Sequence, residues 1–322
     1  MLSFIIRRIL IFIPMMFLVS IVSFTIIELQ PGDYASQYID NPSASPEQIA
    51  LIIEKFALDK SPVHRYALWM KGILTEFDFG YSFSFKRPVA ALIWERMGWT
   101  VVIAFLSIIV QWVLAVPLGI YSAMHPYSKT DMTLTFISFM GVSIPEFFFA
   151  IMLMFLLLNM GVTSIGGLFS PAFIGAPFSL AKVADLIAHI WLPVAVVSLS
   201  GLASLMRVMR GNMLDMVNAP FVQSLRAKGI SEKQIRAHVV KNAVNPMVSI
   251  AGMQLPTVFS GTIIAAIVLG LPTMGPFFYK ALLNHDQHLV MAFLLFIAFI
   301  TQVGNLLADI ALAALDPRIR MK

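Results

Sequence analysis

Long apolar runs alternate with polar segments along this chain, and the length of these runs is typical of membrane-spanning helices. A helix needs about 20 predominantly apolar residues to cross the hydrocarbon core of a bilayer. Runs of this kind occupy Ile9–Leu29, Thr100–Ala123, Thr133–Met160, Leu186–Met206, Met247–Leu271 and Leu289–Leu315. The pattern therefore predicts an all-α integral membrane protein with six transmembrane helices.

The polar segments between these runs divide the chain into regions. We expect residues 1–29 to form the N-terminal cytosolic end and the first span. Residues 30–98, which prolines interrupt repeatedly, are expected to form a small extracytoplasmic subdomain. Residues 99–316 then form a core of five transmembrane helices, with a polar insert at 207–246 between the fourth and fifth spans and a cytosolic tail at 317–322. The first run is too long for a signal peptide and lacks a small-residue cleavage site, so we expect it to remain uncleaved.

Composition supports the membrane prediction. Charged residues make up 12% of the chain and hydrophobic residues 59%, whereas a soluble domain is about one-quarter charged. The absence of cysteine excludes disulfides, thiolate catalysis and cysteine-ligated metal sites.

The distribution of positive charge predicts the orientation in the membrane. Lys and Arg gather in residues 1–8, 207–246 and 316–322, and acidic residues there are few. Cytosolic loops carry an excess of Lys and Arg near the ends of spans, so both termini are expected in the cytosol. The same rule explains the net charge of +5 without a nucleic-acid partner.

The insert at 207–246 contains the sequence signals of two short helices. Asn218 and Pro220 suit the start of the first helix, and Gly229 allows a left-handed stop after it. Ser231, followed by Gln234, predicts a capping box at the start of the second helix. A short amphipathic helix can bind a groove on a protein partner or lie on anionic lipid. Its small apolar face favours the protein groove.

No catalytic motif accompanies these features. The chain has no Gly-x-x-x-x-Gly-Lys-Ser/Thr loop for nucleotide phosphates, no His-Glu-x-x-His and no Gly-x-Ser-x-Gly. We predict no catalytic residues, no metal site and no cofactor held by this chain.

Polar residues inside the apolar runs are candidates for a transport pathway. Ionisable groups in a membrane are costly and usually face the bundle interior or a water-filled cavity. The candidates are Glu146, Gln254, Asn305 and Asp309. A local hydrogen bond between helices is the alternative explanation, and it is favoured for Asp309. Three prolines, Pro145, Pro193 and Pro256, are expected to interrupt the third, fourth and fifth spans.

Several motifs together resemble the permeases of ABC importers, in the branch named for dipeptide and oligopeptide uptake. The main motif is Phe221-Val-x-x-x-Arg-Ala-Lys-Gly-x-Ser231, followed by a second helix and Asn242-Ala-x-x-Pro246. The supporting motifs are Phe4-Ile-Ile-Arg-Arg-Ile-Leu10, Pro31-Gly-Asp33, Gly80-Tyr-Ser82, Pro88-Val89, Ser143-Ile-Pro145-x-Phe147, Leu192-Pro193, Arg207-x-x-Arg210 and Asp316-Pro-Arg-Ile-Arg320. The resemblance covers nearly the whole chain.

The resemblance implies a multi-pass protein of a prokaryotic cytoplasmic membrane that works by alternating access. Its partners would be a second, related permease, two cytosolic ATP-binding subunits that hold ATP and Mg²⁺, and an extracellular or periplasmic substrate-binding protein. The residues implied to contact the ATP-binding subunits are Phe221, Val222, Gln223, Ser224, Leu225, Arg226, Ala227, Lys228 and Gly229.

Two departures from the family pattern bear on mechanism and substrate. Gln223, Ser224 and Leu225 occupy the positions of an older Glu-Ala-Ala consensus. Ala266 stands where peptide permeases usually have Glu, and Pro272-Thr-Met-Gly275 resembles members associated with oligosaccharide uptake. The sequence thus favours an oligosaccharide over an oligopeptide. An ion-coupled carrier without an ATPase and a membrane scaffold without transport remain the alternatives.

Overall fold

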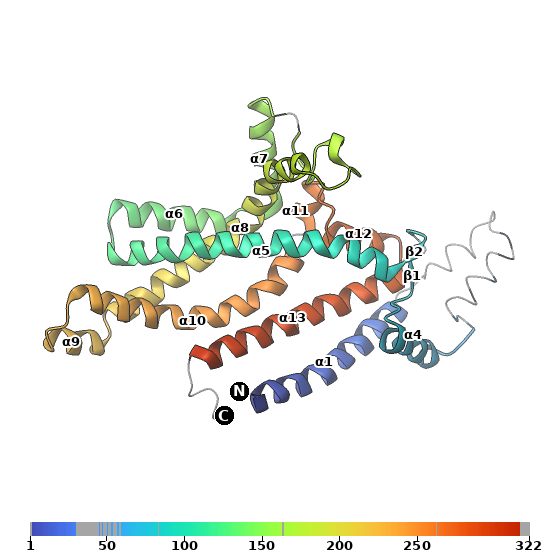
Figure 1. The fold of residues 1–322 in the computed structure, drawn as a ribbon, viewed down its shortest axis with the longest axis horizontal. Coiled ribbons are helices and arrows are strands. Elements are labelled where there is room, and N and C mark those ends of the chain that lie inside the picture. The colour runs from blue at the N-terminus through green and yellow to red at the C-terminus, as the bar shows by residue number, and fades with distance from the viewer. Residues whose placement is uncertain are drawn as a thin grey trace. The chain divides into compact units, whose positions relative to one another are not determined.

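The computed structural model describes residues 2–29, 45, 47, 50, 53, 57, 59–82, 84–162, 164–261 and 263–315. The predicted tail at 317–322 and most of residues 30–58 lie outside this set. The described chain forms two compact units. Figure 1 shows its helices and strands. The larger unit comprises Val101–Leu271 and the chain from Val303 onward, and the smaller unit comprises Leu2–Thr100 and Pro272–Gln302.

Helices dominate both units. The elements in the smaller unit are α1 (Leu2–Glu28), α4 (Pro62–Glu76), the hairpin strands β1 (Tyr81–Ser82) and β2 (Arg87–Pro88), and α12 (Met274–Leu283). The larger unit contains α6 (Lys129–Ser143), α7 (Glu146–Asn159), the 3-10 turn η1 (Pro171–Phe173), α8 (Leu180–Val217), α9 (Pro220–Ala227), α10 (Glu232–Gly261) and α11 (Ile263–Val268). Two further helices, α5 (Val89–Met124) and α13 (Gln287–Leu315), contribute residues to both units.

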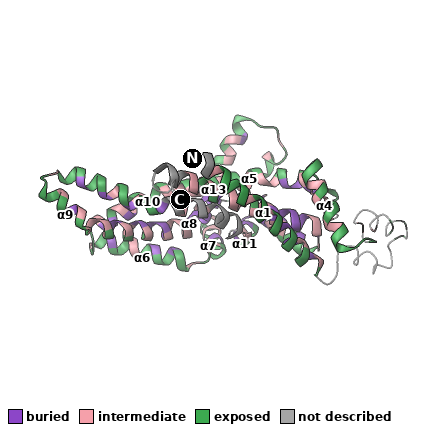
Figure 2. Cartoon of the chain, turned by 90° about the horizontal axis from the view of Figure 1, so that it is seen from below, coloured by how far each residue is buried: buried purple, intermediate pink, exposed green. Residues whose placement is uncertain are grey.

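Helix α8 is the centre of the larger unit, where it packs against both α6 and α10. Its buried stripe includes Met206, Met209 and Met213, spaced as expected for one face of a helix. Gly119 of α5 allows a close approach to this stripe, because a Cβ at that position would lie 2.7 Å from the Cβ of Met209. Figure 2 shows that α6 and α10, which pack against α8, each have buried and exposed residues.

Helix α8 extends beyond the predicted fourth span. We expected this span to end at Met206 and a separate polar insert to follow, but α8 continues to Val217. The buried methionine stripe continues to Met213, which explains why the helix does not stop where the basic residues begin. Helix α10 likewise joins the predicted return helix to the first part of the predicted fifth span.

The predicted third span is broken. Helices α6 and α7 meet at an angle of 106° across a short connection. Pro145 lies between them, and Ile144 before it is extended, with φ −82° and ψ 122°. A residue before proline is sterically disfavoured in the helical region. The sequence therefore predicted the position of this interruption correctly, and the predicted third span consists of two helices.

The helices that could cross a membrane by length and composition confirm the all-α membrane class. Among the described residues they are Ile5–Glu28, Val89–Met124, Leu180–Val217 and Gln287–Leu307, with α6 and α7 as a bent pair. Together they give four to five candidate spans. The predicted fifth span, Met247–Leu271, is not among them, so the count of six is not confirmed. Its residues are divided between α10, whose first half is charged, and the short α11.

A buried carboxylate organises the smaller unit. Asp286, in the connection between α12 and α13, accepts a 2.5 Å hydrogen bond from the Ser82 hydroxyl of the hairpin. The Ser82 oxygen in turn accepts from the backbone N–H of Phe85. An ion pair between Arg65 and Glu28 joins α4 to α1. The Ser82–Asp286 hydrogen bond thus fixes the short hairpin to a connection that is distant in the sequence.

Candidate functional site

Helix α9 forms a compact projection between α8 and α10. Pro220 occupies its first turn, where proline lacks only an N–H that would have no partner within the helix. Gly229 follows the helix with φ +73°. Its N–H donates to the Arg226 carbonyl at 2.9 Å, and the N–H of Ile230 donates to the Leu225 carbonyl at 3.2 Å. The left-handed glycine stop that the sequence predicts is therefore confirmed.

The caps beside α9 differ from those predicted. Ala219, and not Asn218, occupies the N-cap position. Asn218 instead ends α8, where its Nδ2 donates to the Leu214 carbonyl at 2.9 Å. The Ser231 hydroxyl donates to Oε1 of Gln234 at 3.0 Å, so these two side chains bond to each other, and not to backbone N–H groups as in a capping box.

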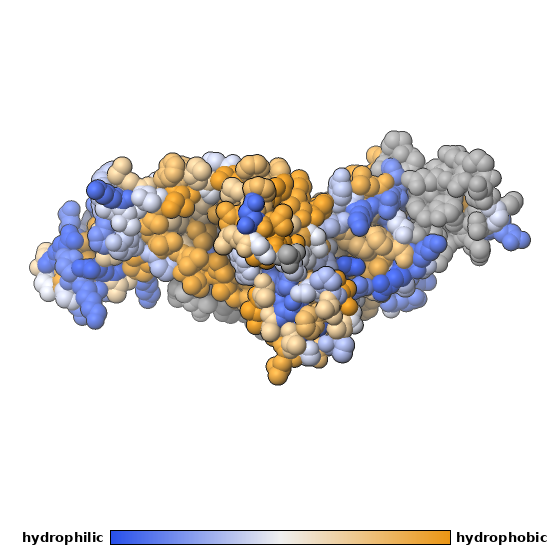
Figure 3. All heavy atoms as spheres, turned by 90° about the horizontal axis from the view of Figure 1, so that it is seen from above, coloured by the Kyte–Doolittle hydropathy of each residue, from blue (hydrophilic) through white to orange (hydrophobic). Residues whose placement is uncertain are grey.

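The two faces of α9 have different environments. Val222 is 1% exposed and belongs to the core of the larger unit, with Phe221 and Leu225 packed against that core. The opposite face is exposed and consists of Gln223, Ser224, Arg226, Ala227, Lys228 and Gly229. The core therefore holds α9 rigidly while the helix presents a mainly polar surface. Figure 3 shows hydrophilic side chains gathered over this end of the larger unit.

An exposed ion pair braces the turn after α9. The Arg226 Nε donates to Oε1 of Glu232 at 2.8 Å. This hydrogen bond lowers the pKa of the Glu232 carboxyl and raises the pKa of Arg226. The pair links α9 directly to the first residue of α10, across the glycine stop.

A groove of about 470 Å³ lies beside α9. Its lining residues come from the connection between α5 and α6, the end of α8, α9 itself and the start of α10. Val222 and Ile235 contribute apolar side chains to its lining. Arg226 and Glu232 contribute their ion pair, and Arg236 adds a further positive charge. Such a groove next to a projecting helix is a concave surface to which a partner protein can dock.

A buried ion pair fixes the connection between α5 and α6. Nε and Nη2 of Arg210 donate to the two carboxylate oxygens of Asp131 at 2.7 and 2.8 Å. The same carboxylate accepts from the backbone N–H of Tyr127 at 2.9 Å and from the Ser122 hydroxyl. Asp131 is 2% exposed, and its charge is compensated by this bidentate partner. Sequence reasoning did not identify this pair, although Arg207-x-x-Arg210 had been noted as a motif.

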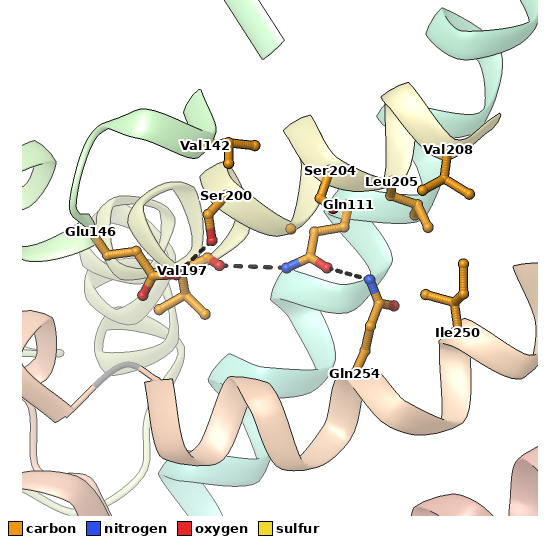
Figure 4. Close-up of a pocket in the computed structure, with 11 residues that line it drawn as sticks. Gln111, Val142, Glu146, Val197, Ser200, Ser204, Leu205, Val208, Ile250 and Gln254 are labelled. Carbon is orange, nitrogen blue, oxygen red and sulfur yellow. Dashed lines mark hydrogen bonds between the residues drawn. The ribbon is translucent and has the colours of Figure 1, made fainter. Parts of the chain in front are cut away.

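A second cavity, of about 390 Å³, lies in the larger unit between α5, α6, α7, α8 and α10. It is lined by Gln111, Val142, Glu146, Val197, Ser200, Gly201, Ser204, Leu205, Val208, Ile250 and Gln254. Figure 4 shows that these side chains converge from α5, α6, α7, α8 and α10. The cavity thus joins polar groups from helices that are otherwise mainly apolar.

Hydrogen bonds connect the amides on one side of this cavity. The Trp112 indole donates to Oε1 of Gln254 at 2.7 Å, and Nε2 of Gln254 donates to Oε1 of Gln111 at 3.1 Å. Nε2 of Gln111 then donates to the Val197 carbonyl at 3.4 Å. Gly201 leaves room for this chain, because a Cβ there would lie 2.5 Å from the Gln111 amide. The network positions two amide side chains at the cavity wall.

Glu146 lies at the opposite end of the cavity in Figure 4. Its Oε1 accepts a hydrogen bond of 2.8 Å from the Ser200 hydroxyl. Its Oε2 is buried and has no hydrogen-bond partner among the described residues. One oxygen of the carboxylate is therefore satisfied and the other is not.

The structure brings together two of the four predicted pathway residues. Glu146 and Gln254 line the same cavity, whereas Asn305 and Asp309 lie on α13 and are not among its described lining residues. Gln111 and Ser200 complete the polar lining but were not predicted. Gln111 carries a sequence signal, since it is a lone amide within a long apolar run. In the described part of the chain, no group of three or more His, Cys, Asp or Glu residues could hold a metal ion.

Taken together, the long apolar helices and the polar lining of this cavity define a multi-pass helical membrane protein. Comparison with known proteins identifies its family. Residues 115–321 match the family described as "Binding-protein-dependent transport system inner membrane component". Residues 1–104 match the corresponding N-terminal family, "Binding-prot-dependent transport system membrane comp, N-term".

Curated relatives agree with this assignment over the full chain. The oligopeptide transport system permease protein AppB of Bacillus subtilis (strain 168) is 34% identical over 322 residues, which cover 99% of each protein. The nickel import system permease protein NikB of Staphylococcus aureus (strain USA300) is 27% identical over 314 residues, covering 96% of this chain and 89% of NikB. The chain belongs to the family of inner-membrane components of binding-protein-dependent transport systems, and its resemblance to ABC importer permeases is confirmed. This membership favours the importer interpretation over an ion-coupled carrier or a scaffold.

Proposed function

We propose that this protein is a transmembrane subunit of an ATP-driven importer and takes up oligopeptides by alternating access. The observation that carries this proposal is the construction of α9, which is anchored through buried Val222 and exposed on its opposite face. A rigid, projecting helix can transmit a push from a partner without any catalytic group of its own. The family membership supports the same role.

The proposed partners are two ATP-binding subunits that dock on α9 and its neighbouring groove, a second permease and a substrate-binding protein. ATP would be bound together with Mg²⁺ and hydrolysed in the ATP-binding subunits, so we propose that α9 lies in the cytosol, as do both termini. The positive charge around α9, with Arg226, Lys228 and Arg236, supports this orientation. We further propose six spans, in which the α6–α7 pair crosses once and the end of α10 together with α11 forms the fifth span.

We favour oligopeptides over oligosaccharides as the substrate. Ala266 and Pro272-Thr-Met-Gly275 favour oligosaccharides, but a full-length relative at 34% identity carries the name of an oligopeptide permease. The identity to this relative over the full chain outweighs the departures from the family motif.

Bulky substitution of the exposed face of α9 tests the coupling role. Ala227→Trp should prevent the ATP-binding subunits from docking, because a large side chain would project from the contact surface without disturbing the buried Val222 side. We expect at least a tenfold fall in substrate-stimulated ATP hydrolysis by the reconstituted importer. The ATP-binding subunits should also be lost when the permease is purified.

The matched control is Ala172→Trp. Ala172 is an exposed alanine in η1 of the same unit, in the loop between α7 and α8. Figure 1 shows this loop beside α7 and away from α9. This variant should retain both association and stimulated hydrolysis. If Ala227→Trp behaves like the control, α9 does not transmit the ATP-driven motion and the proposed coupling role is wrong.

A further inference from the structure

One oxygen of the Glu146 carboxylate in the cavity of about 390 Å³ has no hydrogen-bond partner among the described residues. The amides of Gln111 and Gln254 hydrogen-bond to each other, and the Ser200 hydroxyl donates to Oε1 of Glu146, whereas Oε2 is buried and has no partner among the described residues. A buried carboxylate oxygen without a hydrogen bond or counter-charge is costly. The carboxylate is therefore poised to accept a donor that enters the cavity.

The donor must come from the ligand. The described residues that line the cavity include no Lys, Arg or His, and Glu146 is their one charged member. The lining can thus provide hydrogen-bond acceptors and a single negative charge, but it cannot provide a compensating positive charge. Electrostatic complementarity favours a ligand that carries a positive group.

The geometry favours a protonated primary amine over a metal ion. An ammonium group has three N–H donors and no acceptor. It can give one donor to Oε2 of Glu146 and the others to neighbouring oxygens, including the Ser200 hydroxyl. A transition metal such as nickel prefers several ligands that include imidazole, and the described lining supplies one carboxylate and no histidine.

We propose that this cavity recognises the free amino group of a peptide, with Glu146 as the acceptor. Ser200 serves as the positioning residue, because its 2.8 Å hydrogen bond to Oε1 leaves Oε2 available to the ligand (Figure 4). This inference rests on the proposed uptake of peptides and adds the chemical group that the permease itself recognises.

The test compares two forms of one peptide, with a free amino terminus and with an acetylated amino terminus. Transport of each is measured in the complete importer reconstituted in vesicles, with the same binding protein in every sample. Each variant is scored by its own ratio of free to acetylated transport. This ratio does not depend on the amount of folded protein, and the contribution of the binding protein cancels between wild type and variant.

Glu146→Gln, which keeps the shape of the side chain but removes its charge, should lower this ratio about tenfold, the change expected from losing a charge-assisted hydrogen bond. Glu146→Asp should restore part of the preference. The matched control is Glu76→Gln, which removes an exposed carboxylate at the end of α4 and should leave the ratio unchanged.

The outcomes separate this inference from the proposed function. An unchanged ratio in Glu146→Gln, with both peptides still imported by the wild type, overturns the role of Glu146 and leaves peptide uptake intact. A wild type that imports neither form overturns peptide uptake and this inference together. A lowered ratio that Glu146→Asp partly restores supports both.

Discussion

At the scale of single residues, glycines determine how closely helices of the larger unit pack against each other. Gly119 of α5 faces the buried stripe of α8, where an added Cβ would lie 2.7 Å from the Met209 Cβ and 2.8 Å from the Met206 carbonyl oxygen. Both contacts involve atoms close to the α8 backbone, so they cannot be relieved by turning the end of a flexible side chain. The spacing of α5 and α8 therefore depends on the missing side chain.

We predict that Gly119→Ala destabilises the protein by about 1–3 kcal/mol, the usual cost of overpacking a tight interface. Thermal unfolding of the purified protein in nanodiscs would show this as a lowered midpoint. The control is Gly211→Ala in α8, where an added Cβ meets nothing within 4 Å. That variant should keep or raise the midpoint, because alanine has the higher helix propensity. Equal midpoints for the two variants would contradict the proposed close packing.

Residue-scale features differ in how far the sequence predicts them. The glycine stop after α9 was predictable because it depends only on local backbone conformation at Gly229. The hydrogen bond between Gln111 and Gln254 was not predictable, because it joins residues that are 143 positions apart. Its existence depends on the relative rotation of α5 and α10 about their axes, which the sequence pattern does not specify.

At the scale of elements, the ion pair between Asp131 and Arg210 holds the connection between α5 and α6 against α8. The connection contributes His125 and Pro126 to the groove beside α9, so its position affects the shape of that groove. Removing one member of a buried pair leaves an uncompensated charge, which typically costs several kcal/mol.

We predict that Asp131→Asn lowers the free energy of unfolding by about 3 kcal/mol. Asp215→Asn, at an exposed position of α8, is the control and should have little effect. A double-mutant cycle with Arg210→Met provides the sharper measurement, since removing both partners should cost less than the sum of the single losses. Additive losses would show that the two side chains act independently.

Element boundaries were predicted less well than element types. The ends of the fourth span were assigned from charge, which marks the limit of the membrane, whereas the helix itself ends where its packing ends at Val217. The interruption at Pro145 carried a clear local signal. The 106° angle that follows it depends on tertiary packing of α7 against α8 and α11.

At the scale of the whole molecule, the absence of cysteine makes orientation directly measurable. Single cysteines can be introduced at exposed positions and labelled with a membrane-impermeant thiol reagent. We predict that Ser231→Cys, in the turn before α10, reacts only from the cytosolic side. Ala172→Cys, in η1, should react only from outside. Labelling of both positions from the same side would contradict the proposed orientation and the number of spans between them.

The fold class and the family role could be predicted from the sequence, because they depend on composition and on motifs spread over the full chain. Apolar runs identify helices that can enter a membrane, and the order of motifs identifies the family. The number of spans was harder to predict from the sequence, because α10 combines a charged half and an apolar half in one helix. Hydropathy alone cannot show where such a helix enters the bilayer.

Because α8 is one continuous helix, the directions in which its side chains point at the cavity and beside α9 depend on each other. The helix is 38 residues long, or about 57 Å at 1.5 Å per residue. It carries Ser200 at the cavity and is followed by its C-cap residue Asn218 beside α9, a separation of about five full turns. The two positions therefore share nearly the same angular phase around the helix axis. A single inserted residue between them would rotate one end by about 100° relative to the other, so the length of this segment is fixed by geometry even where its side chains face outward.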